Sequence, residues 1–178
     1  MKKISVVFML CLSMIIIGGC GGSSSKIAEK DLVTKRIETE YFQFDREYRS
    51  VSGVESSLVK KLYESNRNTQ YAYVNDILKE LDKTADKNIE KLNSLKQTTP
   101  QEIVSMDDVS GKLDYSLQIA TLQKQLAQAV RNGDKEAFNE VYGEMITLEQ
   151  RIKRFESYSD KYLSDKISDV KGEPRTRL

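Results

Sequence analysis

The chain of 178 residues contains no histidine and no tryptophan, and its two cysteines are Cys11 and Cys20. Zinc, copper and haem sites almost always use His or Cys ligands. Ser-His-Asp and Cys-His catalysis also need a histidine. We therefore expect no metal, no cofactor and no catalytic residue, and interpret the chain as non-enzymatic. A carboxylate-dependent enzyme of the cell envelope is the weakest of the alternatives.

An excess of one charge sign is also lacking. The chain has 28 Lys and Arg residues against 27 Asp and Glu residues, a formal net charge of +1. Proteins that bind nucleic acid concentrate basic residues on one face, so this balance argues against a nucleic-acid partner. Only two prolines and nine glycines interrupt the chain, which favours helix throughout.

The N-terminus has the organisation of a secretory signal. Lys2 and Lys3 precede an apolar run from Ile4 to Ile17, which is shorter than the ~20 residues of a spanning helix. The run ends in Ile17-Gly18-Gly19-Cys20, where the two small glycines leave the chain open to a peptidase. Residues 1–19 are thus predicted to be a cleaved signal peptide. A plain secretory signal, or an uncleaved anchor with a chance cysteine, are the alternatives.

This arrangement resembles the signal peptide and lipobox of bacterial lipoproteins. The resemblance implies that Cys20 carries a diacylglyceryl thioether and becomes the first residue of the mature chain. Two acyl chains hold a protein stably at a membrane, whereas one does not. The resemblance therefore implies a lipid anchor on the extracytoplasmic face of the cell membrane. Residues 20–26 would then be the lipidated cysteine and a flexible Gly/Ser tether.

Four stripes of apolar residues follow the tether at the three- and four-residue spacing of amphipathic helices. They predict an all-α fold, a four-helix and antiparallel up-and-down bundle over residues 27–171, followed by a disordered tail over 172–178. The stripes are Ile37, Tyr41, Phe44, Tyr48 and Val51; Val74, Leu78, Leu81, Ala85, Leu92 and Leu95; Tyr115, Ile119, Leu122, Leu126 and Ala129; and Phe138, Val141, Met145, Leu148, Ile152 and Phe155.

Two helix boundaries have clear local signals. Thr99-Pro100-Gln101-Glu102 combines a capping box with a proline in the first helical position, which predicts a helix that begins at Thr99. Asn132-Gly133-Asp134 combines a left-handed stop with an N-cap aspartate for the next helix.

The first turn of the bundle has two candidate positions. One is Gly53, after which the second helix would be very long. The other is the polar stretch from Glu64 to Gln70, across which the phase of the apolar stripe changes. The phase change favours the second position, because it gives four helices of similar length.

Part of the body also resembles poorly characterised small helical lipoproteins of Gram-positive bacteria. The likeness covers Leu92 to Phe155 and rests on Leu95-Lys96-Gln97-Thr98-Thr99-Pro100 and on the Asn-Gly-Asp turn. These motifs mark helix ends, so the resemblance implies a fold more than a function.

A dense run of charges extends from Lys79 to Lys91. Its spacing predicts pairs three residues apart within one helix, between lysines 79, 83 and 87 and the acids Asp82, Asp86 and Glu90. We interpret this run as a solvated helix face.

The segment from Met106 to Asp114 superficially suggests a calcium loop, but its acids do not fall in the EF-hand register. We expect an ordinary helix there, with a weak point at Gly111.

Tyrosines are frequent in the chain, and aromatic side chains offer large contact areas at binding surfaces. Tyr41, Phe42, Tyr71 and Tyr73 are the candidates for a partner groove. Core packing also explains Tyr41, which falls on an apolar stripe, while Phe42 lies beside that stripe.

The sequence therefore predicts a membrane-anchored surface lipoprotein that binds an envelope protein or the cell wall through its helical faces. Exclusion or immunity, in which such a protein blocks a phage or a conjugation machine, is a specific version of this hypothesis. The alternative is a helical bundle that binds a lipid or a small apolar ligand.

Overall fold

The computed structural model describes residues 24–52, 59–62 and 71–174. These residues form helices and no strands, which confirms the all-α class. Residues 59–62 are helical. The other helices are α1 (Ser24–Ser52), α3 (Tyr71–Thr98), α4 (Gln101–Val104), α5 (Asp107–Asn132), α6 (Lys135–Ser157) and α7 (Ser159–Lys171).

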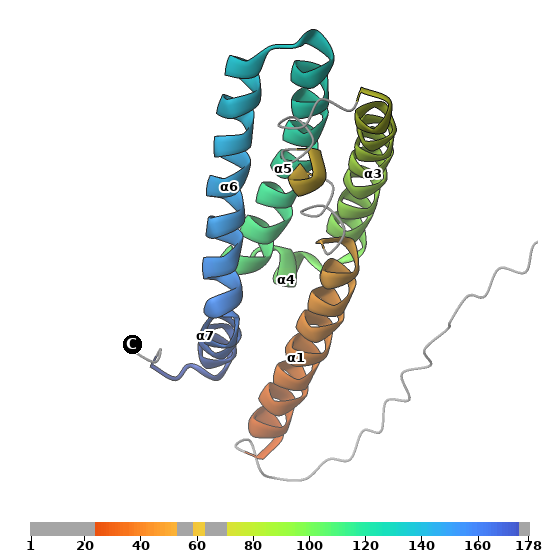
Figure 1. The fold of residues 1–178 in the computed structure, drawn as a ribbon. Coiled ribbons are helices and arrows are strands. Elements are labelled where there is room, and N and C mark those ends of the chain that lie inside the picture. Colours follow the sequence, from red (N-terminus) through yellow and green to blue (C-terminus); the bar gives the residue numbers. More distant parts are fainter. Residues whose placement is uncertain (1–23, 53–58, 63–70, 175–178) are drawn as a thin grey trace, which may run out of the picture.

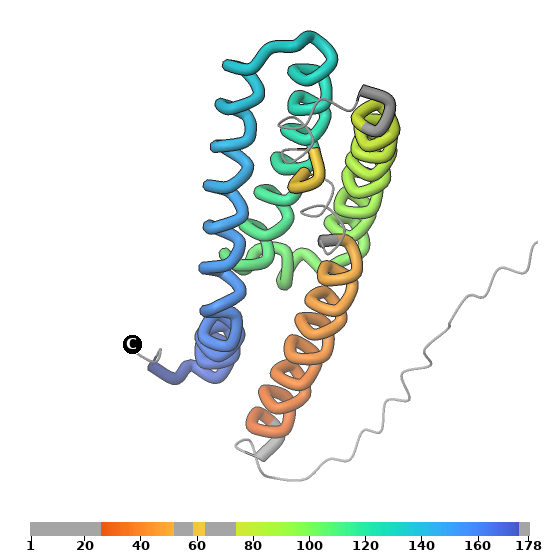
Figure 2. Tube along the Cα trace, viewed as in Figure 1, coloured from red at the N-terminus to blue at the C-terminus, as the bar shows by residue number. Residues whose placement is uncertain are grey.

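The helices build an elongated body around α5 (Figures 1 and 2). Helix α5 packs against α3 on one side and against α6 on the other. Helix α1 occupies the lower half in Figure 1, where it contacts the end of α3 and the crossing helix α7. The short α4 forms the turn between α3 and α5.

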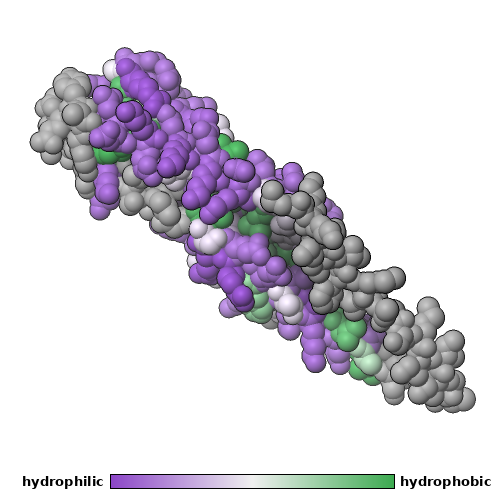
Figure 3. All heavy atoms as spheres, turned by 90° about the vertical axis from the view of Figure 1, so that its right-hand side faces the viewer, coloured by the Kyte–Doolittle hydropathy of each residue, from purple (hydrophilic) through white to green (hydrophobic). Residues whose placement is uncertain are grey.

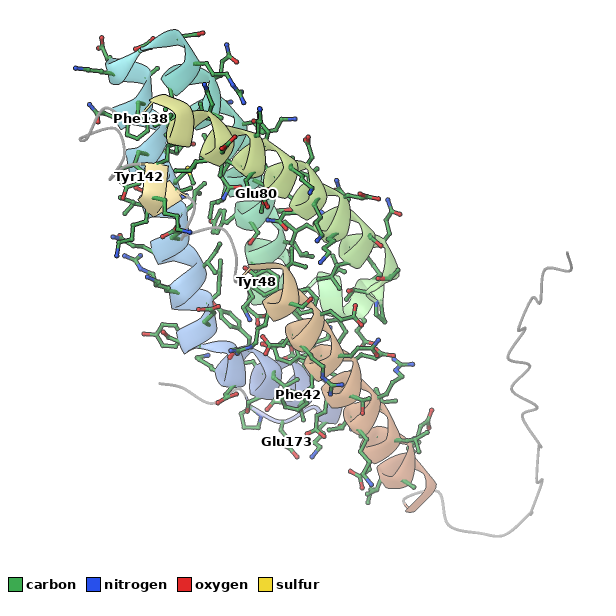
Figure 4. All side chains as sticks on the ribbon, turned by 45° about the vertical axis from the view of Figure 1, so that its right-hand side comes forward. Phe42, Tyr48, Glu80, Phe138, Tyr142 and Glu173 are labelled. Atoms are coloured by element: carbon green, nitrogen blue, oxygen red, sulfur yellow. The ribbon has the colours of Figure 1, made fainter. Side chains whose placement is uncertain are left out.

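Two hydrophobic clusters fill this body. The upper core lies between α3, α5, α6 and residues 59–62, and the lower core lies between α1, α4, α7 and the near ends of α3 and α5. Phe138 and Tyr142, which stack in the upper core, and Tyr48 in the lower core are labelled in Figure 4. Buried residues of the lower core include Ile37, Tyr41, Phe44, Tyr48, Val51, Leu92, Ile103, Val109 and Leu113.

Three ion pairs join α3 to α5 along their exposed edge. Lys96 lies 2.9 Å from Asp114, Lys124 lies 2.7 Å from Asp86, and Arg131 pairs with Asp82. From one pair to the next, the residue number falls on α3 and rises on α5, so the two helices are antiparallel. The predicted pairing within the charge run is therefore wrong for Asp82 and Asp86, whose described partners lie on the neighbouring helix.

The turn between α5 and α6 confirms its prediction. Gly133 adopts the left-handed conformation with φ 68°, and the Asp134 side chain accepts a hydrogen bond from the Ala137 amide at 3.0 Å. Glycine takes that conformation at little cost, and the aspartate satisfies an otherwise free amide.

A helix begins one residue after the position predicted from Thr99, but the predicted capping box is absent. Pro100 is the N-cap of α4, no side chain caps that helix, and Glu102 instead accepts a hydrogen bond from Arg36 of α1 at 2.7 Å. Helix α4 ends after one turn, and α5 begins at Asp107. The break between α4 and α5 buries Ile103 and Met106 in the lower core. Capping rules consider only neighbouring residues and do not include the stability that this burial provides.

The last predicted helix is also divided. Tyr158 leaves the helical conformation (φ −116°, ψ 11°) and separates α6 from α7. Helix α7 then turns across the lower end of the body and buries Leu163 in the lower core (Figure 1). At the first turn, α1 ends at Ser52; both candidate positions, Gly53 and residues 64–70, lie outside the described residues.

Candidate functional site

The most unusual chemistry in the described residues is a cluster of buried polar groups between α1, α5 and the α6–α7 junction. Asp108 and Lys112 on α5 are completely inaccessible to solvent, and Tyr41 on α1 is 3 % exposed. Asp45, also on α1, borders the cluster. We call these four residues the buried charge cluster.

Lys112 lies at the centre of the buried charge cluster. Its Nζ atom lies 3.6 Å from Asp45 Oδ1 and 3.7 Å from Asp108 Oδ2, and 5.9 Å from the centroid of the Tyr41 ring. Both carboxylate distances exceed hydrogen-bond length, and Nζ has no hydrogen-bond partner among the described residues. Lys112 is thus held by charge and by the ring face rather than by directed bonds.

Asp108 and Tyr41 form the one short hydrogen bond of the cluster. The Tyr41 hydroxyl donates to Asp108 Oδ2 at 2.5 Å. Burial raises the pKa of Asp108, and the Tyr41 hydrogen bond and the charge of Lys112 oppose that rise. Burial and the bond to Asp108 also raise the pKa of the Tyr41 phenol. The phenol therefore remains a proton donor throughout the neutral range.

Asp45 connects the cluster to the surface. Its Oδ2 atom accepts a hydrogen bond from Arg49 Nε at 2.7 Å, one turn further along α1. Asp45 raises the pKa of the Arg49 guanidinium through this bond and through its charge. Because Arg49 is largely exposed, this outer pair contributes little to stability.

A second polar contact continues the cluster along the same two helices. Tyr48 Oη and Ser116 Oγ lie 2.8 Å apart in a buried hydrogen bond. The partner of Tyr41 is 67 positions later in the chain and the partner of Tyr48 is 68 positions later. The residue numbers therefore rise together along both helices, and α1 and α5 run in the same direction. We call the three contacts Tyr41–Asp108, Asp45–Lys112 and Tyr48–Ser116 the polar ladder.

The inner residues of the polar ladder, Asp108 and Lys112, are closed to solvent, and only Asp45 at its edge is partly exposed, which decides what the ladder can do chemically. Asp45 and Asp108 flank one amine, but Asp108 and Lys112 have no exposed surface from which to reach a substrate. General acid–base catalysis needs hydrogen-bond reach to a bound reactant. The ladder therefore fixes the position of α1 on α5, and in this conformation it does not form an active site.

Of the four predicted groove residues, the structure describes the side chains of Tyr41 and Phe42. Tyr41 is buried, whereas Phe42 is 54 % exposed and contacts the Tyr41 ring edge-on, with centroids 6.0 Å apart. Figure 4 labels Phe42 near the middle of α1. Tyr71 and Tyr73 lie in the first turn of α3, but their side chains are outside the described residues. Ile17, Gly18, Gly19 and Cys20 are outside them as well.

Two open cavities are lined by described residues. One of about 250 Å³ lies between α5 and α6 and is lined by Leu117, Gln118, Thr121, Leu122 and Glu144. The other, of about 220 Å³, lies where α4 and the start of α5 meet α7, and three aspartates line it. Both are smaller than the ~300–1,000 Å³ typical of ligand pockets. Within the described ranges, no three His, Cys, Asp or Glu residues are placed so that they could hold a metal ion together.

Sequence reasoning missed Asp108 and Lys112. The signal was present, because the apolar stripe of this helix at Tyr115 and Ile119 reaches Lys112 and Asp108 when it is continued toward the N-terminus at the same spacing. A charged pair four residues apart on a core-facing stripe indicates buried charges.

The visible face in Figure 3 is mostly hydrophilic with a few small hydrophobic groups. Among the described helices, none has both the length and the apolar character needed to cross a bilayer. Comparisons with protein families, with curated proteins and with solved structures give no match.

Proposed function

We propose that the protein is a lipoprotein held by Cys20 at the extracytoplasmic face of the cell membrane. The observation that carries the proposal is the order of features at the N-terminus: Lys2 and Lys3, the apolar run from Ile4 to Ile17, and Gly18-Gly19-Cys20 before a Gly/Ser tether. Helix α1 begins at Ser24, four residues after this cysteine.

The helical body is proposed to be a non-enzymatic binding module for an envelope protein or the cell wall, with exclusion or immunity as a specific form. The burial of Asp108 and Lys112 supports this function over catalysis, because both charged groups hold α1 on α5 and neither is exposed to a substrate. In its finer form the proposal treats α1, α3, α5 and α6 as an antiparallel four-helix bundle. The common direction of α1 and α5, with α3 opposed to both, supports that form.

A small apolar ligand is the second candidate, and the cavity between α5 and α6 favours it. Leu117 and Leu122 contribute apolar lining there. Its volume of about 250 Å³ and its open form make it a shallow groove rather than an enclosed site. A groove of this kind also suits a side chain of a protein partner.

The anchor is tested by metabolic labelling with palmitate and by membrane fractionation. Cys20→Ala is expected to abolish labelling and to release the protein from the membrane fraction or leave it as an unprocessed precursor. Cys11→Ala is the matched control, because this cysteine lies in the apolar run and would be removed with it. Unchanged labelling of the Cys20→Ala variant would contradict the anchor.

The partner is tested by crosslinking in cells followed by mass spectrometry. A photoreactive residue at the exposed Phe42 position samples the outer face of α1. The same residue at position 42 in the Cys20→Ala chain controls for contacts made away from the membrane. Recovery of one envelope protein or a peptidoglycan fragment only with the anchored chain supports the proposal. Equal yields from both chains would count against it.

A further inference from the structure

The first two turns of α1 make few contacts with the body. Residues 26–32 are all exposed, and the first buried side chain of α1 is Thr34. Two large apolar side chains lie in this stretch: Ile27 is 59 % exposed and Leu32 is 74 % exposed. Figure 3 shows hydrophobic atoms near the lower end of the molecule, where α1 begins. Apolar surface of this kind is stabilised when it leaves water.

The direction of the Leu32 side chain follows from one contact between α1 and α7. Lys30 Nζ donates a hydrogen bond to the carbonyl of Lys171 at 2.8 Å, so this side of α1 faces the end of α7. Leu32 is two residues later, about 200° further around the helix. It therefore points away from α7, on the side of α1 that no described helix covers.

The short connection to Cys20 brings this stretch close to the membrane in the proposed lipoprotein. Three residues separate Cys20 from Ser24, and even fully extended the four steps between the two Cα atoms span at most about 14 Å. At a rise of 1.5 Å per residue, Ile27 is about 5 Å and Leu32 about 12 Å from the start of the helix. The tether thus keeps Ile27 within about 19 Å and Leu32 within about 26 Å of Cys20, and both side chains can reach the lipid headgroups when α1 lies along the membrane surface.

Charges in the same stretch limit how deep it can lie. Lys26, Lys30 and Lys35 are balanced by Glu29 and Asp31 to within one unit. Asp31 lies within the arc between Ile27 and Leu32, and a carboxylate in the hydrocarbon core is costly. The headgroup layer accommodates both the apolar and the charged side chains of this stretch, because lysines extend their charged ends toward water.

We propose that the first two turns of α1, through Ile27 and Leu32, lie in the lipid headgroup layer of the membrane that holds Cys20 and thereby orient the helical body. This inference rests on the proposed lipid anchor. The acyl chains hold the protein, and the apolar side chains fix the direction of α1. The near balance of charge makes the contact apolar in origin, so salt has little effect on it.

The test uses the full lipidated chain in vesicles of phosphatidylethanolamine and phosphatidylglycerol. Cys11 is removed with the signal and Cys20 is acylated, so Leu32→Cys provides the one free thiol for an environment-sensitive fluorophore such as NBD. The matched control is Ile146→Cys, an exposed apolar position in the middle of α6. Vesicle flotation reports the anchor independently of the fluorophore.

We expect the fluorophore at position 32 to emit at shorter wavelength on vesicles and to be quenched by headgroup spin labels, at low and high salt alike. The fluorophore at position 146 should behave as it does in water. If the protein floats but the two positions behave alike, the orientation by α1 is wrong and the anchor is intact. If the protein does not float, the anchor itself fails, and the inference with it. A blue shift at position 32 without quenching would indicate a protein partner or a second copy, and would overturn the lipid contact.

Discussion

Gly111 is the position where the structure makes its sharpest quantitative prediction. A Cβ atom added to this glycine of α5 would lie 2.2 Å from Cε2 and 2.5 Å from Cζ of Phe155 on α6. The Phe155 ring stacks on Tyr115, with centroids 5.9 Å apart, and contacts Tyr162 at 6.1 Å. Glycine therefore allows the ring to cover the α5 backbone where α6 ends.

Two opposing effects determine the result of Gly111→Ala. Alanine in a helix interior is about 1 kcal/mol more favourable than glycine. An extra methyl group in a packed contact costs about 1–3 kcal/mol. Phe155 is half-buried, so its ring can move outward, but only by giving up its aromatic contacts. We expect the steric cost to win and the free energy of unfolding to fall by about 1 kcal/mol.

Gly143 is the matched control, because it lies within α6 and a Cβ atom there would meet nothing within 4 Å. Gly143→Ala should raise the free energy of unfolding by about 1 kcal/mol. The two variants should then differ by about 2 kcal/mol in urea unfolding followed by circular dichroism, or by about 6 °C in Tm. Equal stabilisation by both alanines would refute the close contact. In a Phe155→Ala chain, Gly111→Ala should become stabilising, which assigns the penalty to the ring.

The remaining predictions concern the polar ladder and one helix cap. Lys112→Met should lower the free energy of unfolding by about 3 kcal/mol, because it leaves buried Asp108 without its cation. Adding Asp108→Asn to this variant should restore most of the loss. Strictly additive losses in urea unfolding would contradict this coupling. Tyr41→Phe should cost about 1–3 kcal/mol, since Asp108 loses its donor. The raised pKa of Tyr41 stabilises the fold below the ordinary pKa of tyrosine, and this stability is lost as pH rises above about 10 and the unfolded phenol ionises. The Phe variant should therefore lose stability less steeply between pH 10 and 11, and equal slopes would argue against the buried phenol. Asp134→Ala should cost about 1 kcal/mol and Asp134→Asn much less, because asparagine still accepts the Ala137 amide; an equal loss in both would point away from the cap.

The sequence predicts those parts of the fold that depend on neighbouring residues. The stop at Gly133 and the cap at Asp134 are decided within a few residues, and both are confirmed. The helix boundary near Thr99 is correct to within one residue, but its capping box does not form, because the decisive partners are distant: Glu102 bonds to Arg36, and Ile103 is buried against α1. A capping box competes poorly with such tertiary contacts.

The charge run of α3 shows the same limit from another direction. Spacing alone offers Asp82 and Asp86 partners on their own helix, and each such pair is worth only a few tenths of a kcal/mol. Arg131 and Lys124 of α5 take these acids instead. Because the energies of the two pairings are so similar, the direction and register of the neighbouring helix decide between them, and a single helix contains no information about either.

The polar ladder accounts for the register of another helix pair, that of α1 against α5. A shift of α1 by one turn in one direction would place Asp45 beside Asp108, and two buried carboxylates repel each other strongly. A shift by one turn in the other direction would place Ile37 beside Asp108 and remove the Tyr41 donor, which leaves a buried carboxylate without a hydrogen bond. Apolar contacts alone would distinguish these arrangements weakly, because one apolar side chain of the stripe replaces another. The buried charges therefore add little net stability, but they make the observed position of α1 the one in which every carboxylate has a partner.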